Sequence, residues 1–165
     1  MSIDRDSFRQ TLSRFASGVT VVSTRRADGT PIGVTVSAFC SVSIEPPLIL
    51  VCLDKANQDV EAYAEGKSFA VNVLAADQAV ISNTFAFPGP VPPFKTIPFS
   101  EGLDGVPILE GAAATLQCAR HATHDGGDHW IVVGRVEEAA WTEKPLLIYA
   151  EGSYKFLSES TEAAD

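Results

Sequence analysis

The stretch "GVTVSAFCSVS", residues 33–43, decides how this chain is interpreted. Every second residue is apolar, and because side chains alternate between the two faces of a strand, this predicts a strand that we expect to bend near Cys40. The apolar set is Val34, Val36, Ala38, Cys40, Val42 and, one residue beyond, Ile44. The opposite face holds Gly33, Thr35, Ser37, Phe39, Ser41 and Ser43. A face of small hydroxyls without any charge indicates either a platform for a flat ring with polar edges or an exposed edge strand.

Working outward from this stretch, strand patterns dominate the chain. Turn signals separate them: Asp28-Gly29, Pro46-Pro47 and the "DGGD" of residues 125–128. Many short strands with few helices favour an antiparallel β-barrel, and 165 residues are enough for one domain covering 1–165. The expected strands lie at 19–24, 33–43, 48–54, 68–75, 112–124 and 129–141, with a last strand and turn within 145–157.

Three short helices are expected between the strands. In the first, within residues 4–18, Phe8, Leu12 and Phe15 form an apolar stripe, an Asp near the start caps the helix and Gly18 ends it. Two more are expected at 57–66, capped by Asn57, and at 77–86, capped by Asp77. Residues 88–98 contain five prolines and predict an irregular loop that covers a site or a partner surface.

Composition excludes several classes of protein. The formal net charge is −9, which argues against a nucleic-acid surface and against binding to anionic membranes. The longest apolar candidate, "PPLILVCLD", is too short to cross a bilayer, and "MSIDRDSFRQ" has no apolar signal region. Three widely spaced cysteines without a CxxC pattern fit a reducing compartment, so we expect a cytoplasmic protein.

Two groups of residues are candidates for chemistry. Lys55 follows a strand and precedes the helix expected at Asn57, which is an arrangement that favours an anion, although a capped helix with a solvated lysine is the simpler interpretation. The segment "HATHDGGDH" carries three histidines. Strand alternation puts His121 and His124 on opposite faces, so we expect no metal site. His129, at the start of a strand, is the more plausible functional histidine.

Familiar catalytic signatures are missing. There is no GxSxG nucleophile motif and no recognisable set of Ser, His and Asp, so hydrolysis has weak support. There is also no GxGxxG after a strand, so a Rossmann dinucleotide site is not indicated.

Five segments taken in order resemble the short-chain flavin reductases that serve two-component flavin-dependent monooxygenases. The resemblance covers nearly the whole chain and implies a split β-barrel that binds flavin, usually as a homodimer. It implies transfer of hydride from NADH, or possibly NADPH, to FMN or FAD, and release of the reduced flavin to a partner monooxygenase. The segments are "FRQTLSRFASGVTVVST", "GVTVSAFCSVSIEPPLILVCLDK", "SFAVNVLA", "GDHWIVVGRVEE" and "PLLIYAEGSY".

The resemblance also implies roles for individual residues. His129 would lie near the nicotinamide as the catalytic residue, and Tyr154 would help to bind the nicotinamide nucleotide. The flavin ring would be contacted by Thr35, Val36, Ser37, Ala38 and Ser41. The flavin phosphate would be contacted by Lys55, Ala56 and Asn57. Two further residues, Phe85 and Ala86, would lie beside the flavin.

Two departures from the family pattern bear on specificity. Lys155 stands after Tyr154 where relatives often carry arginine, which leaves the choice between NADH and NADPH open, and the Pro-rich loop differs from many relatives. Two other interpretations remain at this point. One is a flavin-binding barrel that does not turn over NADH, such as a flavin store or a relative of pyridoxamine-phosphate oxidase. The other is a barrel that serves only as an interaction module.

Overall fold

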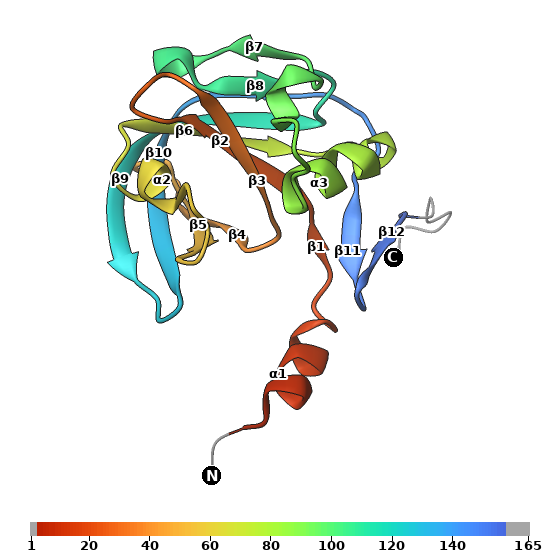
Figure 1. The fold of residues 1–165 in the computed structure, drawn as a ribbon. Helices are drawn as coiled ribbons and strands as arrows, with labels where there is room; N and C mark the ends of the chain where they lie inside the picture. The colour runs from red at the N-terminus through yellow and green to blue at the C-terminus, as the bar shows by residue number, and fades with distance from the viewer. Residues whose placement is uncertain (1–2, 158–165) are drawn as a thin grey trace.

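The computed structural model describes residues 3–157 and is mainly β, with short helices (Figure 1). Its largest element is a seven-stranded antiparallel sheet with the order β3-β2-β6-β9-β10-β5-β4. Its strands are β2 (Thr20–Arg25), β3 (Pro31–Val36), β4 (Phe39–Ser43), β5 (Leu48–Asp54), β6 (Ser68–Val73), β9 (Ala114–Asp125) and β10 (His129–Trp141).

The two edge strands of this sheet follow one another in the chain. β3 is one edge and β4 is the other, yet only Ser37 and Ala38 separate them. The sheet must therefore curl until its edges approach, but the two edges do not pair with each other. The result is a barrel that is split between β3 and β4, which confirms the predicted antiparallel split β-barrel.

The bend lies at Ser37–Ala38, so its predicted position near Cys40 is wrong. The shift has a consequence for the faces of the strand. Val36 is buried, and the next side chain to pack on the same core is Phe39, three residues later. The alternation thus changes phase at the bend, and the apolar set ceases to face inward: Val42 is 51% exposed and Ile44 is 91% exposed.

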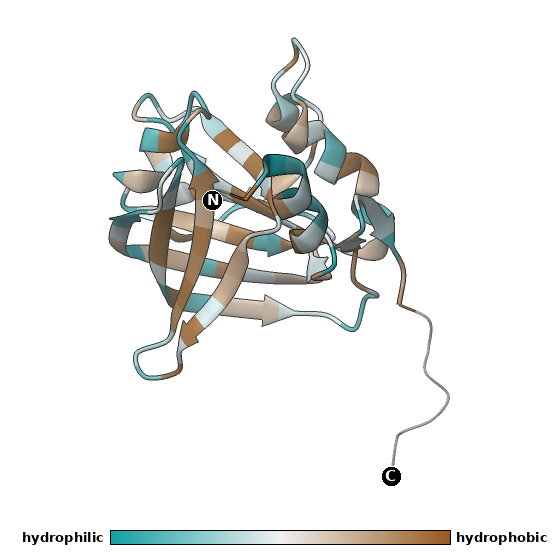
Figure 2. Ribbon diagram, turned by 90° about the horizontal axis from the view of Figure 1, so that it is seen from below, coloured by the Kyte–Doolittle hydropathy of each residue, from teal (hydrophilic) through white to brown (hydrophobic). Residues whose placement is uncertain are grey.

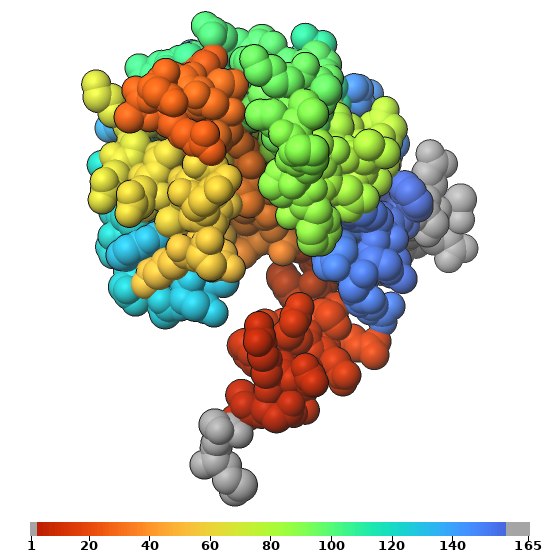
Figure 3. All heavy atoms as spheres, in the orientation of Figure 1, coloured from red at the N-terminus to blue at the C-terminus, as the bar shows by residue number. Residues whose placement is uncertain are grey.

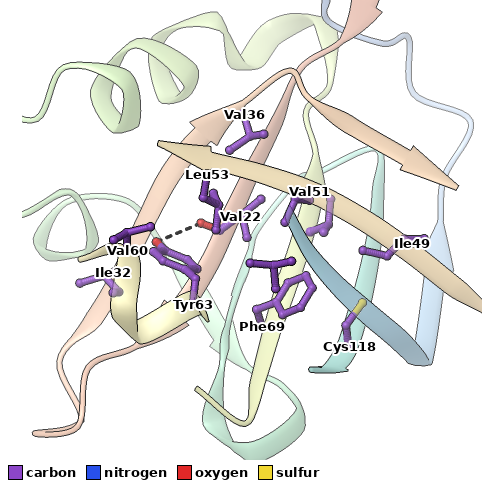
Figure 4. Close-up of a cluster of buried hydrophobic side chains, with 12 residues drawn as sticks. Val22, Ile32, Val36, Ile49, Val51, Leu53, Val60, Tyr63, Phe69 and Cys118 are labelled. Carbon is purple, nitrogen blue, oxygen red and sulfur yellow. Dashed lines mark hydrogen bonds between the residues drawn. The ribbon is translucent and has the colours of Figure 1, made fainter. Parts of the chain in front are cut away.

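Two clusters of buried side chains hold the barrel together. The larger fills the barrel and includes Tyr63, whose hydroxyl donates to the Val22 carbonyl over 3.4 Å (Figure 4). Burial raises the pKa of Tyr63, which keeps the phenol neutral. The second lies under α3 and is joined from the Pro-rich loop by Phe94, whose ring lies 4.9 Å from that of Phe85. The loop at 88–98 is therefore anchored to the core.

The helices are shorter than predicted. They are α1 (Arg5–Leu12), α2 (Val60–Ala64) and α3 (Ala79–Ala86), with 3-10 turns η1 (Ala76–Gln78), η2 (Pro93–Lys95) and η3 (Leu103–Gly105). Asp4 caps α1 as predicted, accepting hydrogen bonds from the N–H groups of Asp6 and Ser7. The predicted end at Gly18 is wrong, because α1 ends at Leu12 and Gly18 lies in a strand.

The other two predicted caps are also wrong. α2 begins at Val60, and Asn57 instead accepts a hydrogen bond from the Asp59 N–H over 2.8 Å within the preceding turn. At the third helix, the Gln78 side chain accepts from the Ala75 N–H over 3.0 Å, so Asp77 is not needed as a cap.

Two small sheets flank the barrel. β1 (Ser17–Gly18), β11 (Ile148–Ala150) and β12 (Ser153–Lys155) form one, and β7 (Phe99–Glu101) pairs with β8 (Pro107–Leu109) in the other. β1 carries the chain out of the barrel to α1, which projects from the body (Figure 1). Figure 2 looks onto that end and shows α1 in front of the strands. Within residues 3–157, no helix has the length and apolar character that crossing a bilayer requires.

The predicted apolar stripe of the first helix meets no core of its own chain. Phe8 is 48% exposed, Leu12 is 55% exposed and Phe15, which lies beyond the helix, is 83% exposed. No residue of α1 is buried. The amphipathic pattern therefore indicated a helix correctly, but its apolar stripe stays largely exposed on this chain.

Close packing of α3 on β3 gives a test of the fold. A Cβ atom on Gly33 would lie 2.7 Å from Cε1 of Phe85, so Gly33→Ala forces the ring or the helix to move. We expect the free energy of unfolding, measured in urea, to fall by about 1–3 kcal/mol. Gly18→Ala is the control, because no atom lies within 4 Å of its added Cβ. An equal loss in both variants would contradict this packing.

Candidate functional site

Four pockets meet at Ser37, and this residue lines every one of them. We name them for their most distinctive walls: the histidine pocket, of about 190 Å³; the tyrosine pocket, of about 480 Å³; the α1 pocket, of about 520 Å³; and the cysteine pocket, of about 400 Å³. The bend between the two sheet edges is thus the centre of a groove, which is open to solvent between α1 and the barrel (Figure 3).

The histidine pocket brings together six of the twelve predicted site residues. They come from three places far apart in the sequence: the end of β3 with its bend, the turn after β5, and the start of β10. Predicted residues that line it are Thr35, Val36, Ser37, Ala38, Asn57 and His129. The rest of the wall was not predicted and consists of Val34 on β3 and Cys52, Leu53 and Asp54 at the end of β5.

Antiparallel pairing explains why His129 reaches this pocket. His129 lies opposite Asp54 in the register of β10 and β5, so both side chains stand at the same end of the barrel. Nδ1 of His129 lies 2.7 Å from Oδ1 of Asp128, and the hydrogen bond from the imidazole lowers the pKa of that carboxyl group. The Asp128 contact fixes one ring nitrogen, which leaves Nε2 as the atom with which His129 can meet a ligand.

The bend offers unused donors to the groove. Among the hydrogen bonds of residues 3–157, none is donated by the N–H groups of Ser37 or Ala38, and Ser37 is exposed. The hydroxyl of Thr35, by contrast, is occupied, because it donates to the Ser82 carbonyl over 2.6 Å. Backbone donors, the free hydroxyl of Ser37 and the Asn57 side chain suit a flat ring with polar edges better than they suit a metal ion.

The tyrosine pocket lies on the other side of the bend. It contains the predicted residues Thr35, Ser37, Ala86 and Tyr154. The hydroxyl of Tyr154 lies 2.8 Å from Oγ of Ser82 and 2.9 Å from Oδ1 of Asn83, so Tyr154 fastens the C-terminal hairpin to α3.

Several residues of the tyrosine pocket were not predicted. Phe87 follows α3 and is 81% exposed, and Tyr149 packs edge to face on Tyr154 with ring centroids 5.8 Å apart. The sequence signal that could have identified Phe87 is an aromatic residue directly after a predicted helix. Tyr149 was harder to find, because its place depends on pairing between β11 and β12.

Lys55 and Ala56 occupy a turn at the far side of the histidine pocket. Nζ of Lys55 lies 2.6 Å from Oδ2 of Asp125 and 4.3 Å from the centroid of Trp130. The hydrogen bond from Lys55 lowers the pKa of Asp125. Ala56 is exposed, and its N–H donates to Oδ1 of Asp54 over 2.8 Å. The predicted helix end at Asn57 is absent here, so any anion would meet a turn and a shared lysine.

Four predicted site residues line none of the four pockets: Lys55 and Ala56 in the turn described above, and Phe85 and Ser41. Phe85 is 2% exposed and points into the second core cluster, because the helical turn that exposes Ala86 turns Phe85 toward Phe94. Its side chain therefore faces the core and lines none of the four pockets, and its place beside a flavin stays a prediction. Ser41 is exposed on β4, beyond the bend, and also lines none of them.

The cysteines are free thiols with different surroundings. Cys118 is buried, which raises its pKa to about 12, and burial also raises the pKa of Cys52. Cys40 is exposed on the edge strand β4, Cys52 is partly buried, and only Cys118 is a core residue. Over the described range 3–157, no cluster of three His, Cys, Asp or Glu side chains is arranged to hold a metal ion.

Comparison with known proteins connects this geometry to a family. The model of the flavin reductase like domain matches residues 12–158. The chain is 40% identical to the FMN reductase (NADH) SmoA of Agrobacterium fabrum over 90% of this chain and 83% of SmoA. It is 39% identical to HsaB of Rhodococcus jostii, the reductase subunit of a flavin-dependent monooxygenase, over 93% of this chain and 78% of HsaB.

The fold has solved counterparts as well. The NADH:FAD oxidoreductase SgcE6 of Streptomyces globisporus C-1027, solved in complex with NAD and FAD fragments, superposes with a TM-score of 0.90 at 33% identity, covering 96% of each chain. Some relatives are longer: the chain spans 48% of one further relative and 53% of one further solved structure. The family match extends over far more than half of the sequence, and the chain belongs to the flavin reductase like domain family.

Proposed function

We propose that this protein is an NAD(P)H:flavin oxidoreductase that transfers hydride from NADH, or possibly NADPH, to FMN or FAD. The observation that carries the proposal is the histidine pocket, where free backbone donors at Ser37 and Ala38 face His129 across a small cavity. SmoA and SgcE6, which this chain resembles, are an FMN reductase (NADH) and an NADH:FAD oxidoreductase.

Each part of the groove has a task in this proposal. The backbone at Val36 and Ala38, with Ser37 and Thr35, holds the polar edge of the flavin ring, and Ala86 extends that contact from the tyrosine pocket. A bound flavin supplies the redox chemistry by accepting the hydride. The protein has to hold the two rings in contact and exclude water between them, which is a task of positioning.

The nucleotide phosphates and the nicotinamide need separate contacts. Lys55, Ala56 and Asn57 meet the flavin phosphate at the turn after β5. His129 orients the nicotinamide through Nε2, and Tyr154 holds the hairpin that forms the wall of the nicotinamide nucleotide site. No acid–base pair is required for the hydride transfer itself, so His129 acts by binding and orientation.

The reduced flavin is handed to a partner monooxygenase. HsaB, which this chain resembles over 93% of its length, is the reductase subunit of a flavin-dependent monooxygenase. The groove supports release, because it contacts the flavin mainly through hydroxyls and backbone groups. A site without several arginines on the phosphate holds a flavin less firmly than one that has them.

Oxidation of NADH under air tests the function. With purified protein, absorbance at 340 nm should fall rapidly only when FMN or FAD is added, and the faster flavin identifies the preferred one. The same rate without added flavin would mean that flavin is a firmly bound group. If neither NADH nor NADPH is consumed while flavin binds, the protein is a flavin-binding barrel without turnover, and the absence of both activities would indicate an interaction module.

Loss of the imidazole tests the role of His129. His129→Ala removes the contact to the nicotinamide and should raise the KM for NADH by about five- to tenfold, with flavin affinity changed less than twofold. His124→Ala is the matched control, because His124 is exposed on β9 and lines none of the four pockets. Equal losses of NADH and flavin binding would contradict the assignment.

We also infer a homodimer. The half-exposed Phe8 of α1 and the uncharged edge strand β4, with Val42 exposed and Ile44 exposed just beyond it, are apolar surfaces that a second copy of the chain would cover. Sedimentation velocity at micromolar concentration should give twice the chain mass. A monomeric mass would contradict this part of the proposal.

Two further inferences concern the domain organisation and the cellular compartment of the protein. We infer that residues 1–165 act as one domain, because Leu147, near the C-terminal hairpin, is packed in the same cluster as Val19 and Leu74. The exposed free thiol of Cys40 suits a reducing compartment, so we place the protein in the cytoplasm.

A further inference from the structure

A cationic rim lies at the open end of the groove, where α1 meets the C-terminal hairpin. Arg9 and Glu151 line the α1 pocket. Arg14 forms an ion pair with Glu151, and Nζ of Lys155 lies 3.7 Å from Oε2 of the same carboxylate. Two cations thus share one acidic side chain and Arg9 lies beside them without an ion-pair partner among the described residues, in a chain whose formal net charge is −9.

Arg9 is the cation of this rim that no carboxylate compensates. Arg14 and Lys155 both lie against Glu151, whereas Arg9 makes no ion pair within residues 3–157. Asp4 caps α1 and Asp6 lies in its first turn, but neither lines the pocket, and Asp4 accepts hydrogen bonds from the N–H groups of Asp6 and Ser7. The guanidinium of Arg9 is therefore free to bind an anion that enters the groove.

The rim is held in place by the chain itself. The Glu151 N–H donates to the Ser13 carbonyl over 2.9 Å, which joins the end of α1 to the tip of the β11–β12 hairpin. Glu151 has a φ of 52°, and a residue other than glycine adopts this conformation at a cost. The hairpin tip thus keeps Glu151, and with it Arg14, beside the α1 pocket.

The rim and the bend belong to the same cavity. Ser37 and Arg9 line one pocket of about 520 Å³, so a ligand whose ring lies over the bend can extend to α1 without leaving the groove. A diphosphate presents several oxygens and a double negative charge, and the planar fork of an arginine binds two such oxygens at once.

We propose that the α1 pocket binds the diphosphate of a dinucleotide, with Arg9 as its principal contact. This rests on the proposed function for the ring that lies over the bend. Both FAD and NADH contain a diphosphate, and binding measurements with each of them show which ligand the pocket takes. Mononucleotides, which lack the diphosphate, reach the bend but not Arg9.

Equilibrium binding measured by calorimetry tests the site without turnover. Arg9→Gln should weaken binding of FAD or of NADH by about tenfold, because a charge-assisted hydrogen bond is lost. FMN and reduced nicotinamide mononucleotide are the matched ligands, and their affinities should change less than twofold. Arg9→Lys keeps the charge and should restore part of the affinity.

Two further variants separate the phosphate contacts. Arg5→Gln removes the same charge one helical turn earlier, at a residue that does not line the α1 pocket, and should leave all affinities unchanged. Lys55→Met should weaken FMN and FAD alike relative to riboflavin. A selective loss of FAD in Arg9→Gln assigns the pocket to flavin, and a selective loss of NADH assigns it to the nicotinamide nucleotide.

The proposal is overturned if Arg9→Gln binds both dinucleotides as tightly as the unchanged protein. It is also overturned if FMN and FAD weaken equally, or if Arg5→Gln causes the same loss. Failure of the proposed function looks different: the unchanged protein would then bind FAD without oxidising NADH, and the effect of Arg9→Gln on FAD would still decide whether the site exists.

Discussion

The structure depends on one constraint of chain connectivity: two residues must join the opposite edges of a seven-stranded sheet. β3 and β4 are neighbours in sequence and edges in space, so Ser37 and Ala38 form the turn between them. The Ala38 carbonyl still accepts from the Cys52 N–H, but the N–H groups of both residues have no backbone partner in the described part of the chain. The sheet curls to bring its edges together, and the opening remains where these two N–H groups are unpaired. The split of the barrel and the position of the groove therefore have the same cause.

Unpaired backbone is also what makes the bend useful. In a β-sheet nearly all N–H groups are used by neighbouring strands, so few are available to a ligand. At Ser37 and Ala38 these donors stay free, on a rigid support built from the core cluster under Val36 and Phe39. A flat heterocycle with polar edges can be bound there with little side-chain ordering, which limits the entropic cost of binding.

The sequence predicted what depends on alternation and turn chemistry. The hairpin at Asp28-Gly29, the long β9–β10 hairpin and the Asp4 cap all follow from local rules, and the structure contains each of them. The sequence could not predict where the inward-facing residues switch from even to odd positions. The bend lies at Ser37–Ala38 and not near Cys40, because packing of Phe39 in the core outweighs the uninterrupted alternation of apolar residues in the sequence.

The candidate site was predictable to a similar degree. Thr35, Ser37 and His129 were found because the bend and the hairpin end carry distinctive residues, and the pairing of β5 with β10 brings them together. Phe85 was misplaced because a helical side chain can face either core or groove, and one apolar residue does not settle which. Arg9 escaped notice because its relation to Glu151 and Ser37 arises from contacts between segments far apart in the chain.

Electrostatic sharing links the Lys55 phosphate contact to release of the flavin. Lys55 already has a carboxylate partner in Asp125. On the proposed function, a ligand phosphate must compete with Asp125 for Lys55, and this exchange replaces an existing ion pair, so its net gain is small. Lys55 thus contacts the flavin phosphate without holding it firmly, which suits an enzyme whose product must leave for another protein.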